Sequence, residues 1–588
     1  MIKTLAKQIK QFKTASIVTP LFMILEVFCE MAIPYLMASI VDDGIDKGDL
    51  NHIYNIAGGM VIVALVSLFA GAMGGKFGAR ASAGFAHNLR EAMFYRIQKF
   101  SFKEIDKYST AGLVTRLTTD VTNIQNAYQM ILRMLVRSPM SLIAAMIMAF
   151  FLNAKIALIY LAAVFVLAII LVTIMLLAMK HFRVLFEKYD KMNESVQENV
   201  ASIRVVKSFV REEYEKKKFN TASNNIYKLA VAAEKVLSFN NPAMVLTTNA
   251  CILLISWFGA HLVVSNELTT GDLLALLSYC MNILISLMLL SMVFVMITMS
   301  SASAKRVAEV LEQESSIVNP ENPLTEVKDG SITFKNVSFK YYDDADTYVL
   351  NGVDLSIRSG ETIGIVGGTG VGKSTFVNLI SRFYDVNAGE VLVGGANVKD
   401  YDLEVLRNNV SMVLQKNELF TGTIFDNLRW GDENATEEEC INACKIAQAD
   451  EFISNFPEGY NTKIEQGGTN VSGGQKQRLC IARALLKKPK ILILDDSTSA
   501  VDTSTDRKIR EGLKNDRPDM TKIIIAQRIS SVKEADRIIV IEDDKVTAFA
   551  THDELLKINE TYASLYEAQT SGGGDFDEAK LNSKGGEE

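Results

Sequence analysis

The stretch Gly367-Gly368-Thr369-Gly370-Val371-Gly372-Lys373-Ser374 decides how the second half of the chain folds. It fits the pattern G-x-x-x-x-G-K-[ST] and lies between a strand-like apolar run at 362–366 and a helix-like run that begins at Thr375. In this context the glycines allow backbone N–H groups to surround a phosphate chain, and the helix N-terminus adds positive potential. Lys373 is expected to reach the β- and γ-phosphates, and the Ser374 hydroxyl to bind Mg²⁺. The sequence therefore predicts a nucleoside triphosphate site.

The length and the net charge of the chain limit the classes of protein to which it can belong. The chain has 588 residues, of which 49% are apolar, and its net charge is −7. A chain of this length contains several domains. A negative net charge gives no support to a nucleic-acid partner, because such partners are bound through positive charge. We therefore predict no nucleic-acid partner.

The apolar residues are concentrated in six long stretches before residue 300. These stretches lie near residues 16–40, 53–78, 129–152, 156–180, 243–265 and 272–299. Each approaches or exceeds the roughly 20 residues that a helix needs to cross a bilayer. Before them, residues 1–14 alternate lysines with apolar residues at helical spacing, which predicts an amphipathic elbow helix on the membrane surface. We predict an all-α transmembrane domain of six helices over residues 15–303, embedded in the lipid bilayer.

Loop charge predicts the orientation of this domain. Lysine and arginine are frequent in the N-terminal segment and in the segments 80–137 and 180–235, whereas the other connections hold only Lys47 and Lys155 as basic residues. Basic loops stay on the cytoplasmic side. The sequence thus predicts a multi-pass plasma-membrane protein with both termini and the two long loops in the cytoplasm.

Four polar residues within the apolar stretches are candidate substrate contacts. Glu26 and Glu30 are four residues apart on one face of the first stretch, and Asn249 and Asn282 lie in the last two. Carboxylates inside a membrane are costly and usually face an interior cavity. They indicate either a site for a cationic substrate or protons, or a structural contact between helices, and both interpretations stay open.

The soluble half carries a second phosphate-binding pattern. After a charged helix and linker at 304–330, residues 331–568 alternate strand-like and helical runs, which predicts an α/β ATPase domain. The strand at 491–494 leads into Asp495, a carboxylate placed to hold Mg²⁺ opposite Ser374. The run Val-Ser-Gly-Gly-Gln-Lys-Gln-Arg at 471–478 precedes a helix whose start can bind an anion. One domain has no use for two such sites unless the second serves another copy, so we predict a dimer that encloses nucleotide.

These motifs, taken in order, resemble a known family. The sequence GGTGVGKS, Gln415, VSGGQKQR, ILILDD and the run Ser-Ala-Val-Asp at 499–502 resemble the nucleotide-binding domain of ABC transporters. The six preceding spans with two long loops resemble the type-1 membrane domain of ABC exporters, the type IV fold. The resemblance covers about residues 15–568. It implies ATP and Mg²⁺ as cofactors, hydrolysis coupled to transport, and coupling helices near the fragments 113–120 and 203–209.

The resemblance also assigns roles to single residues. Tyr341 corresponds to the aromatic residue that stacks on adenine, with Tyr342 as an alternative. Gln415 corresponds to the glutamine that senses Mg²⁺ and contacts the membrane domain. Asp502 corresponds to the aspartate that communicates across the dimer. The signature that closes over the partner's γ-phosphate corresponds to Ser472, Gly473, Gly474 and Gln475.

Two positions depart from the family pattern. Asp496 occupies the place of the catalytic glutamate, and Gln527 occupies the place of the switch histidine. An aspartate is about 1 Å shorter in reach, and a misplacement of that order can cost roughly 10²-fold in rate. A glutamine can donate a hydrogen bond to a phosphate but cannot carry the charge of an imidazolium. The chain's own phosphate loop is therefore expected to bind ATP and hydrolyse it slowly, whereas its signature is intact.

The combination predicts one half of a heterodimeric bacterial multidrug-type exporter. Its partner half-transporter is expected to carry the intact glutamate and histidine, and the pair to export a hydrophobic, amphipathic or cationic small molecule by alternating access. The alternatives are a homodimeric exporter of lipid or peptide, with a slow site, and an ATP-gated channel or regulator on the same scaffold. The segment 569–588 is Gly-rich and acidic, and we expect it to be a disordered tail.

Overall fold

The computed structural model describes residues 1–342, 345–496 and 501–570, and its contacts divide the chain into two units. The first comprises Met1–Lys99 and Ser109–Gln313, and the second comprises Phe100–Tyr108 and Glu314–Glu588. Two predictions fall wholly or partly outside the described residues: the disordered tail, apart from its first two residues, and the first half of the run at 499–502.

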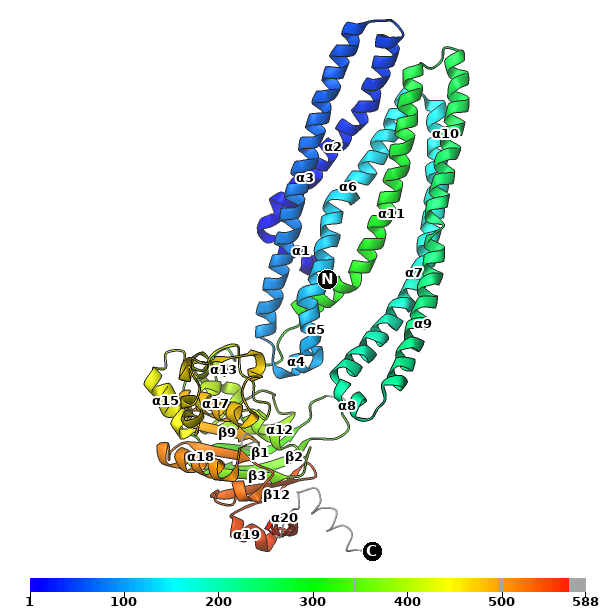
Figure 1. The fold of residues 1–588 in the computed structure, drawn as a ribbon. Coiled ribbons are helices and arrows are strands. Elements are labelled where there is room, and N and C mark those ends of the chain that lie inside the picture. Colours follow the sequence, from blue (N-terminus) through cyan, green and yellow to red (C-terminus); the bar gives the residue numbers. More distant parts are fainter. Residues whose placement is uncertain (343–344, 497–500, 571–588) are drawn as a thin grey trace. The chain divides into compact units, whose positions relative to one another are not determined.

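The first unit is built from six helical stretches that are long and apolar enough to span a membrane, which confirms the predicted six-helix architecture. The helices that form them are α2 (Lys13–Ser39), α3 (Leu50–Gln98), α6 (Val121–Leu152), α7 (Ala154–Ala201), α9 (Glu212–Leu237), α10 (Asn240–Val264) and α11 (Thr270–Glu312). Within this unit α2 packs against α3, α11 against α6, and α7 against α9 and α10 (Figure 1). Apolar side chains such as Leu65 and Phe69 point outward, as expected of helices surrounded by lipid.

The elbow at residues 1–14 is helical but is not one continuous helix. It consists of α1 (Ile2–Ala6) and a 3₁₀ segment (Lys7–Phe12), after which α2 begins. Lys10 has φ 42° and ψ −115°, and this left-handed residue breaks the helix and turns the chain toward the first span.

The second unit has the α/β fold that the sequence predicts. Its main sheet has the order β12-β11-β3-β10-β9-β6, in which all strands are parallel except β12. These strands are β3 (Thr362–Gly367), β6 (Val410–Val413), β9 (Ile491–Asp495), β10 (Thr521–Ile525), β11 (Arg537–Glu542) and β12 (Lys545–Ala550). A smaller antiparallel sheet has the order β2-β1-β4-β5, with β1 (Ile332–Phe339), β2 (Leu350–Ile357), β4 (Ala388–Val393) and β5 (Ala396–Asn397). Strands β9 and β10 are buried along their whole length, as is typical of parallel strands covered on both faces.

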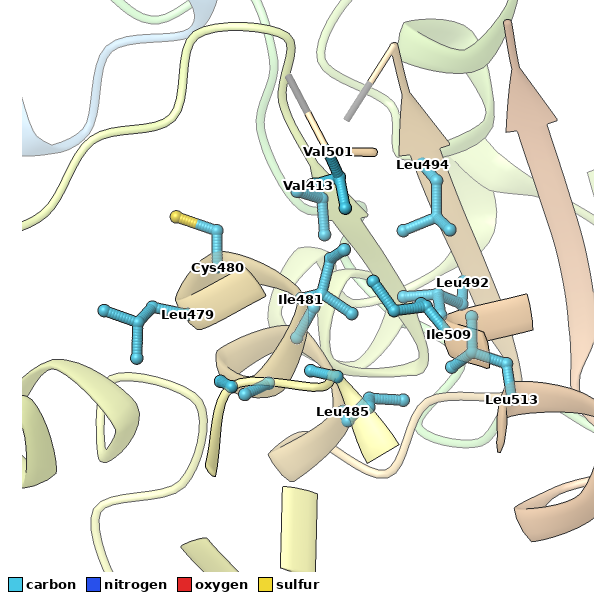
Figure 2. Close-up of a cluster of buried hydrophobic side chains, with 14 of the residues drawn as sticks. Val413, Leu479, Cys480, Ile481, Leu485, Leu492, Leu494, Val501, Ile509 and Leu513 are labelled. Atoms are coloured by element: carbon cyan, nitrogen blue, oxygen red, sulfur yellow. The ribbon is translucent and has the colours of Figure 1, made fainter. Parts of the chain in front are cut away.

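An apolar cluster joins the helices of the second unit to the main sheet. Figure 2 shows Ile481 of α17 (Gly473–Leu486) next to Leu492 and Leu494 of β9, with Ile509 of α18 (Thr503–Asp516) on the same side. All four side chains are almost completely buried. This packing fixes the start of α17 relative to the end of β9, so the signature and the Mg²⁺ carboxylate belong to one rigid body.

A short helix from the membrane half of the sequence belongs to the second unit. The helix α4 (Phe102–Tyr108) places Phe102 against Phe383, with ring centroids 4.6 Å apart, and the Tyr384 hydroxyl donates to Asp106 Oδ2 at 2.6 Å. The expected boundaries include this segment in the membrane domain at 15–303. Its aromatic and acidic side chains find their partners in the ATPase unit instead, just upstream of the 113–120 fragment.

Candidate nucleotide-binding site

The parallel register of the main sheet gathers the candidate phosphate contacts at one edge. Strand β10 lies between β3 and β9, and Ile525 is paired with both Ile365 and Asp495. The residues that directly follow these strands therefore meet at the carboxyl edge, where open α/β sheets bind their ligands. They are the phosphate loop at 367–374, Asp496 and Gln527.

The phosphate loop has the backbone shape that its glycines allow. Gly372 has φ 99°, and a Cβ at this position would lie 2.8 Å from the carbonyl oxygen of Val349, so a side chain does not fit. The helix α12 (Lys373–Ile380) starts at the next residue. Lys373 Nζ donates to the carbonyl oxygens of Gly367 at 2.7 Å and Gly368 at 2.6 Å, which places the ammonium over the loop. Loop, lysine and helix start thus converge on the place where phosphates bind.

Ser374 and Asp495, the two residues predicted to bind Mg²⁺, lie next to each other. The Ser374 hydroxyl is hydrogen-bonded to the Asp495 carboxylate, which is only 4% exposed. Burial raises the pKa of Asp495, although Ser374 and the Lys373 charge act in the opposite direction. A buried carboxylate beside a hydroxyl is a set of hard oxygen donors, so these residues fit a Mg²⁺ ion that also binds the nucleotide phosphates.

The two residues that depart from the family pattern are in contact with each other. Gln527 Nε2 donates to Asp496 Oδ2 at 3.0 Å, and Gln415 forms a further hydrogen bond with the same carboxylate. Burial raises the pKa of Asp496, and the nearby Lys373 charge counteracts this effect. The backbone of Asp496 has φ 46°, in the left-handed region that aspartate tolerates better than most residues. The structure therefore brings Gln415, Asp496 and Gln527 together as one hydrogen-bonded group.

Tyr341 lies beside the phosphate-loop helix, whereas Tyr342 points to solvent. The Tyr341 hydroxyl is 2.8 Å from Thr375 Oγ1, and its ring meets the Tyr384 ring edge-on, with centroids 5.1 Å apart. Tyr342 is 70% exposed. Tyr384 joins the tyrosine expected at adenine to α4 of the same unit, through its bond to Asp106. The sequence contains no pattern that singles out Tyr384.

The signature forms the capped start of α17. Ser472 Oγ accepts a hydrogen bond from Gln475 N at 3.3 Å, and Gln475 Oε1 accepts one from Ser472 N at 2.9 Å. Ser472 and Gly473 are exposed, so this helix start faces outward and can receive an anion. Asp502 caps α18 by accepting a hydrogen bond from Thr505 N at 2.9 Å, without a reciprocal bond.

The two glutamates of the first span are paired with an arginine of the third. Arg137 on α6 lies 3.7 Å from Glu26 Oε1 and also forms an ion pair with Glu30, and all three side chains are about a third exposed or less. Among the described residues, no hydrogen bond joins Asn249 on α10 or Asn282 on α11 to this cluster. The sequence interpretation missed Arg137 because it counted this residue as loop charge, although the residue stands inside the stretch at 129–152.

Comparison with known proteins identifies the family. A family model described as the ABC transporter transmembrane region matches residues 16–288, and one described as ABC transporter matches residues 350–499. The uncharacterized ABC transporter ATP-binding protein YfiB of Bacillus subtilis is 35% identical over 561 residues, which cover 95% of this chain and 97% of that protein. The chain belongs to the ABC transporter family.

Two further proteins are similar over most of their length. The ATP-dependent lipid A-core flippase of Desulfotalea psychrophila is 32% identical over 491 residues, which cover 83% of this chain and 85% of that protein. The solved structure of a bacterial Atm1-family ABC exporter with ATP bound has a TM-score of 0.82, at 25% identity and with coverage of 95% of this chain and 99% of that one. This ABC protein fuses a six-span membrane domain to one ATP-binding domain, the organisation of an exporter half-transporter, which requires a dimer partner.

Proposed function

We propose that this ABC half-transporter is the degenerate-site subunit of a heterodimeric exporter. The observation that carries the proposal is the contact between Asp496 and Gln527, which occupy the positions of a catalytic glutamate and a switch histidine. The partner subunit would carry the glutamate and histidine that are missing here. Hydrolysis would then be concentrated at the site built from the partner's phosphate loop and this chain's signature.

The hydrogen bonds around Asp496 support slow hydrolysis at this chain's own site. The carboxylate is shorter than that of a glutamate, and it already accepts hydrogen bonds from the amides of Gln415 and Gln527. A group that activates water must reach within hydrogen-bond distance of that water, and the shorter side chain of Asp496 is held in place by the two amides. Gln527 can donate a hydrogen bond to a γ-phosphate, but it cannot add positive charge. The site is therefore suited to hold ATP and Mg²⁺ for longer than one transport cycle.

For the transported molecule we propose a hydrophobic or amphipathic solute. The interpretation of Glu26 and Glu30 as a site for cations loses support, because both carboxylates share the positive charge of Arg137. The similarity to a lipid A-core flippase favours a second candidate, export of a lipid. In either case the ATPase domain and both termini would lie in the cytoplasm, as the basic loops predict.

Native mass spectrometry of the tagged, membrane-extracted complex tests the assembly. We expect this chain to be found with one copy of a different half-transporter, whose sequence has glutamate after the Mg²⁺ aspartate and histidine at the switch. A stable homodimer with transport-coupled hydrolysis would contradict the proposal.

Reversion of the two departures tests the site itself. In a complex whose partner site is disabled, Asp496→Glu with Gln527→His is expected to raise ATP turnover by about tenfold or more, because the carboxylate regains its reach. Asp519→Glu is the matched control, since this exposed aspartate lies at the other end of β10. Unchanged turnover in the double revertant would show that these residues do not limit hydrolysis.

A further inference from the structure

The first unit contains an apolar cavity of about 610 Å³ that the nucleotide cycle does not explain. Helix α7, the end of α9 and the start of α10 contribute its lining residues, which are Ile170, Ile174, Leu177, Lys235, Val236, Phe239, Pro242, Ala243 and Leu246. Eight of these nine residues are apolar and one is a lysine. A volume of this size is typical of sites that bind drug-sized or larger apolar ligands.

The charge pattern of the helices places this cavity at the boundary of the membrane. On α7, no charged residue occurs from Ile156 to Met179, and Lys180 ends this apolar segment. On the other side, no aspartate, glutamate, lysine or arginine occurs between Lys235 and Glu267. The cavity therefore starts at the level of Lys235 and extends along the apolar part of both helices. Long basic side chains at such a boundary keep the charge in water and the methylene stem in the apolar region.

The lining side chains are exposed to whatever occupies the cavity. Leu246 is 73% exposed, Phe239 is 68% exposed and Leu177 is 52% exposed. Groups this apolar are stable only against another apolar surface, because water contact costs free energy in proportion to area. The occupant of the cavity must therefore present hydrocarbon along most of its length.

The charge at the rim of the cavity is positive. Lys235 makes no hydrogen bond or ion pair through its ammonium group with any described residue, and Lys180 is exposed at the same end of α7. Glu234 is also exposed, but it is not among the residues that line the cavity. An occupant with an anionic group at one end would thus complement the lysine.

We propose that this cavity holds an acyl chain of an anionic phospholipid of the cytoplasmic leaflet, with its phosphate paired to Lys235. Basic residues at the cytoplasmic ends of membrane helices are known to attract anionic headgroups, and the apolar lining supplies the surface for the chain. The proposal rests on the proposed orientation of the membrane domain but not on the degenerate ATP site. A zwitterionic lipid fits less well, because its headgroup carries no net negative charge for Lys235 to attract.

Photo-crosslinking of the full-length complex in nanodiscs tests the occupant. The probes are phosphatidylglycerol and phosphatidylcholine that carry the same photoactivatable acyl chain. We expect phosphatidylglycerol to label peptides of α7 and α10 at least about five-fold more strongly, given the contribution of one lysine near a lipid phosphate. Lys235→Ala should remove this preference, and Lys235→Arg should keep it. Lys228→Ala is the matched control, because Lys228 is exposed on the same helix outside the cavity lining.

A second variant keeps the test independent of charge. Leu246→Trp fills the cavity and should reduce labelling of these peptides by both probes, while ATP turnover shows that the complex is folded. Equal labelling by both probes, or an unchanged preference in Lys235→Ala, would overturn the proposal. Crosslinks from the cavity residues to the partner half-transporter in place of lipid would overturn it as well. None of these outcomes depends on Asp496 or Gln527. The proposed difference in hydrolysis between the two ATP sites is therefore tested separately.

Discussion

The phosphate-loop edge and the signature helix of the ATPase domain differ in how their polar groups are occupied. At the phosphate-loop edge, the carboxylates of Asp495 and Asp496 are engaged by neighbouring side chains, and Lys373 lies on its own loop. At the signature, Ser472 and Gly473 form an exposed, capped helix start. Both departures from the family pattern lie at the first surface and none at the second. This contrast is what the proposed division between a slow and a competent composite site predicts.

The two surfaces differ in chemistry although they share one core. Ile481 on α17 packs against Leu492 and Leu494 on β9 (Figure 2). A large displacement of either element would therefore change the structure of both surfaces. The departures at Asp496 and Gln527 leave this core intact, because they lie beyond the strand ends. Loss of hydrolysis at one surface is therefore compatible with full use of the other.

Removal of the signature hydroxyl should give the largest effect. Ser472→Ala is expected to lower the ATP turnover of the heterodimer by about 10²-fold, the usual cost of losing one donor to transition-state charge. The steady-state ATPase assay of the purified complex measures it. The variant also removes a helix cap, which costs about 1 kcal/mol of stability.

A second capping box separates these two effects of the serine. Thr436 caps α15 (Glu437–Ile446) through the same reciprocal pair with Glu439 and lies outside both phosphate-binding surfaces. Thr436→Ala should therefore reduce thermal stability to a similar degree and leave turnover unchanged. If Ser472→Ala had no more effect on turnover than Thr436→Ala, the signature would not serve the competent site.

Loss of the adenine contact should have an intermediate effect, on binding rather than on turnover. Tyr341→Ala is expected to weaken ATP binding to this chain by about tenfold, since base–aromatic stacking contributes about 1–3 kcal/mol to the binding free energy. Fluorescent-nucleotide titration of the complex measures the affinity. Tyr342→Ala is the control, and this exposed tyrosine should change nothing. The opposite ranking of the two variants would move the adenine site to Tyr342.

Neutralisation of Asp496 should have the smallest effect. Asp496→Asn is expected to change the turnover of the complex by less than about two-fold, because in the proposed heterodimer the partner's site would carry out most of the hydrolysis. The same steady-state assay applies, with the asparagine matching the aspartate in volume. A loss of tenfold or more would show that Asp496 itself activates water and that the two surfaces are not functionally different.

The sequence predicted those features that depend on local pattern. The six spans follow from long apolar stretches, and the phosphate loop follows from glycines and a Lys-Ser pair between a strand and a helix. The meeting of Asp496 and Gln527 could not be derived from the local sequence, because it depends on β10 pairing with β9 in one particular register. Their roles came from the family resemblance, whereas their contact follows from the register between β9 and β10.

The features that the sequence did not predict are contacts between distant segments. Arg137 pairs with Glu26 and Glu30 across more than a hundred residues, and only the packing of α6 on α2 makes this visible. The helix α4 joins the ATPase unit through Tyr384, a residue without any motif of its own. The helical spacing of residues 1–14 likewise does not predict the kink at Lys10.

Photolabelling with azido-ATP that carries the label on either the α- or the γ-phosphate tests the central claim most directly. After many turnovers of the complex, this chain should retain both labels in nearly equal amounts, because its own site holds ATP that has not been cleaved. The partner subunit should retain the α-label and lose the γ-label. Loss of the γ-label from this chain at the same rate as from its partner would show that both sites hydrolyse ATP, and would contradict the proposed difference between them.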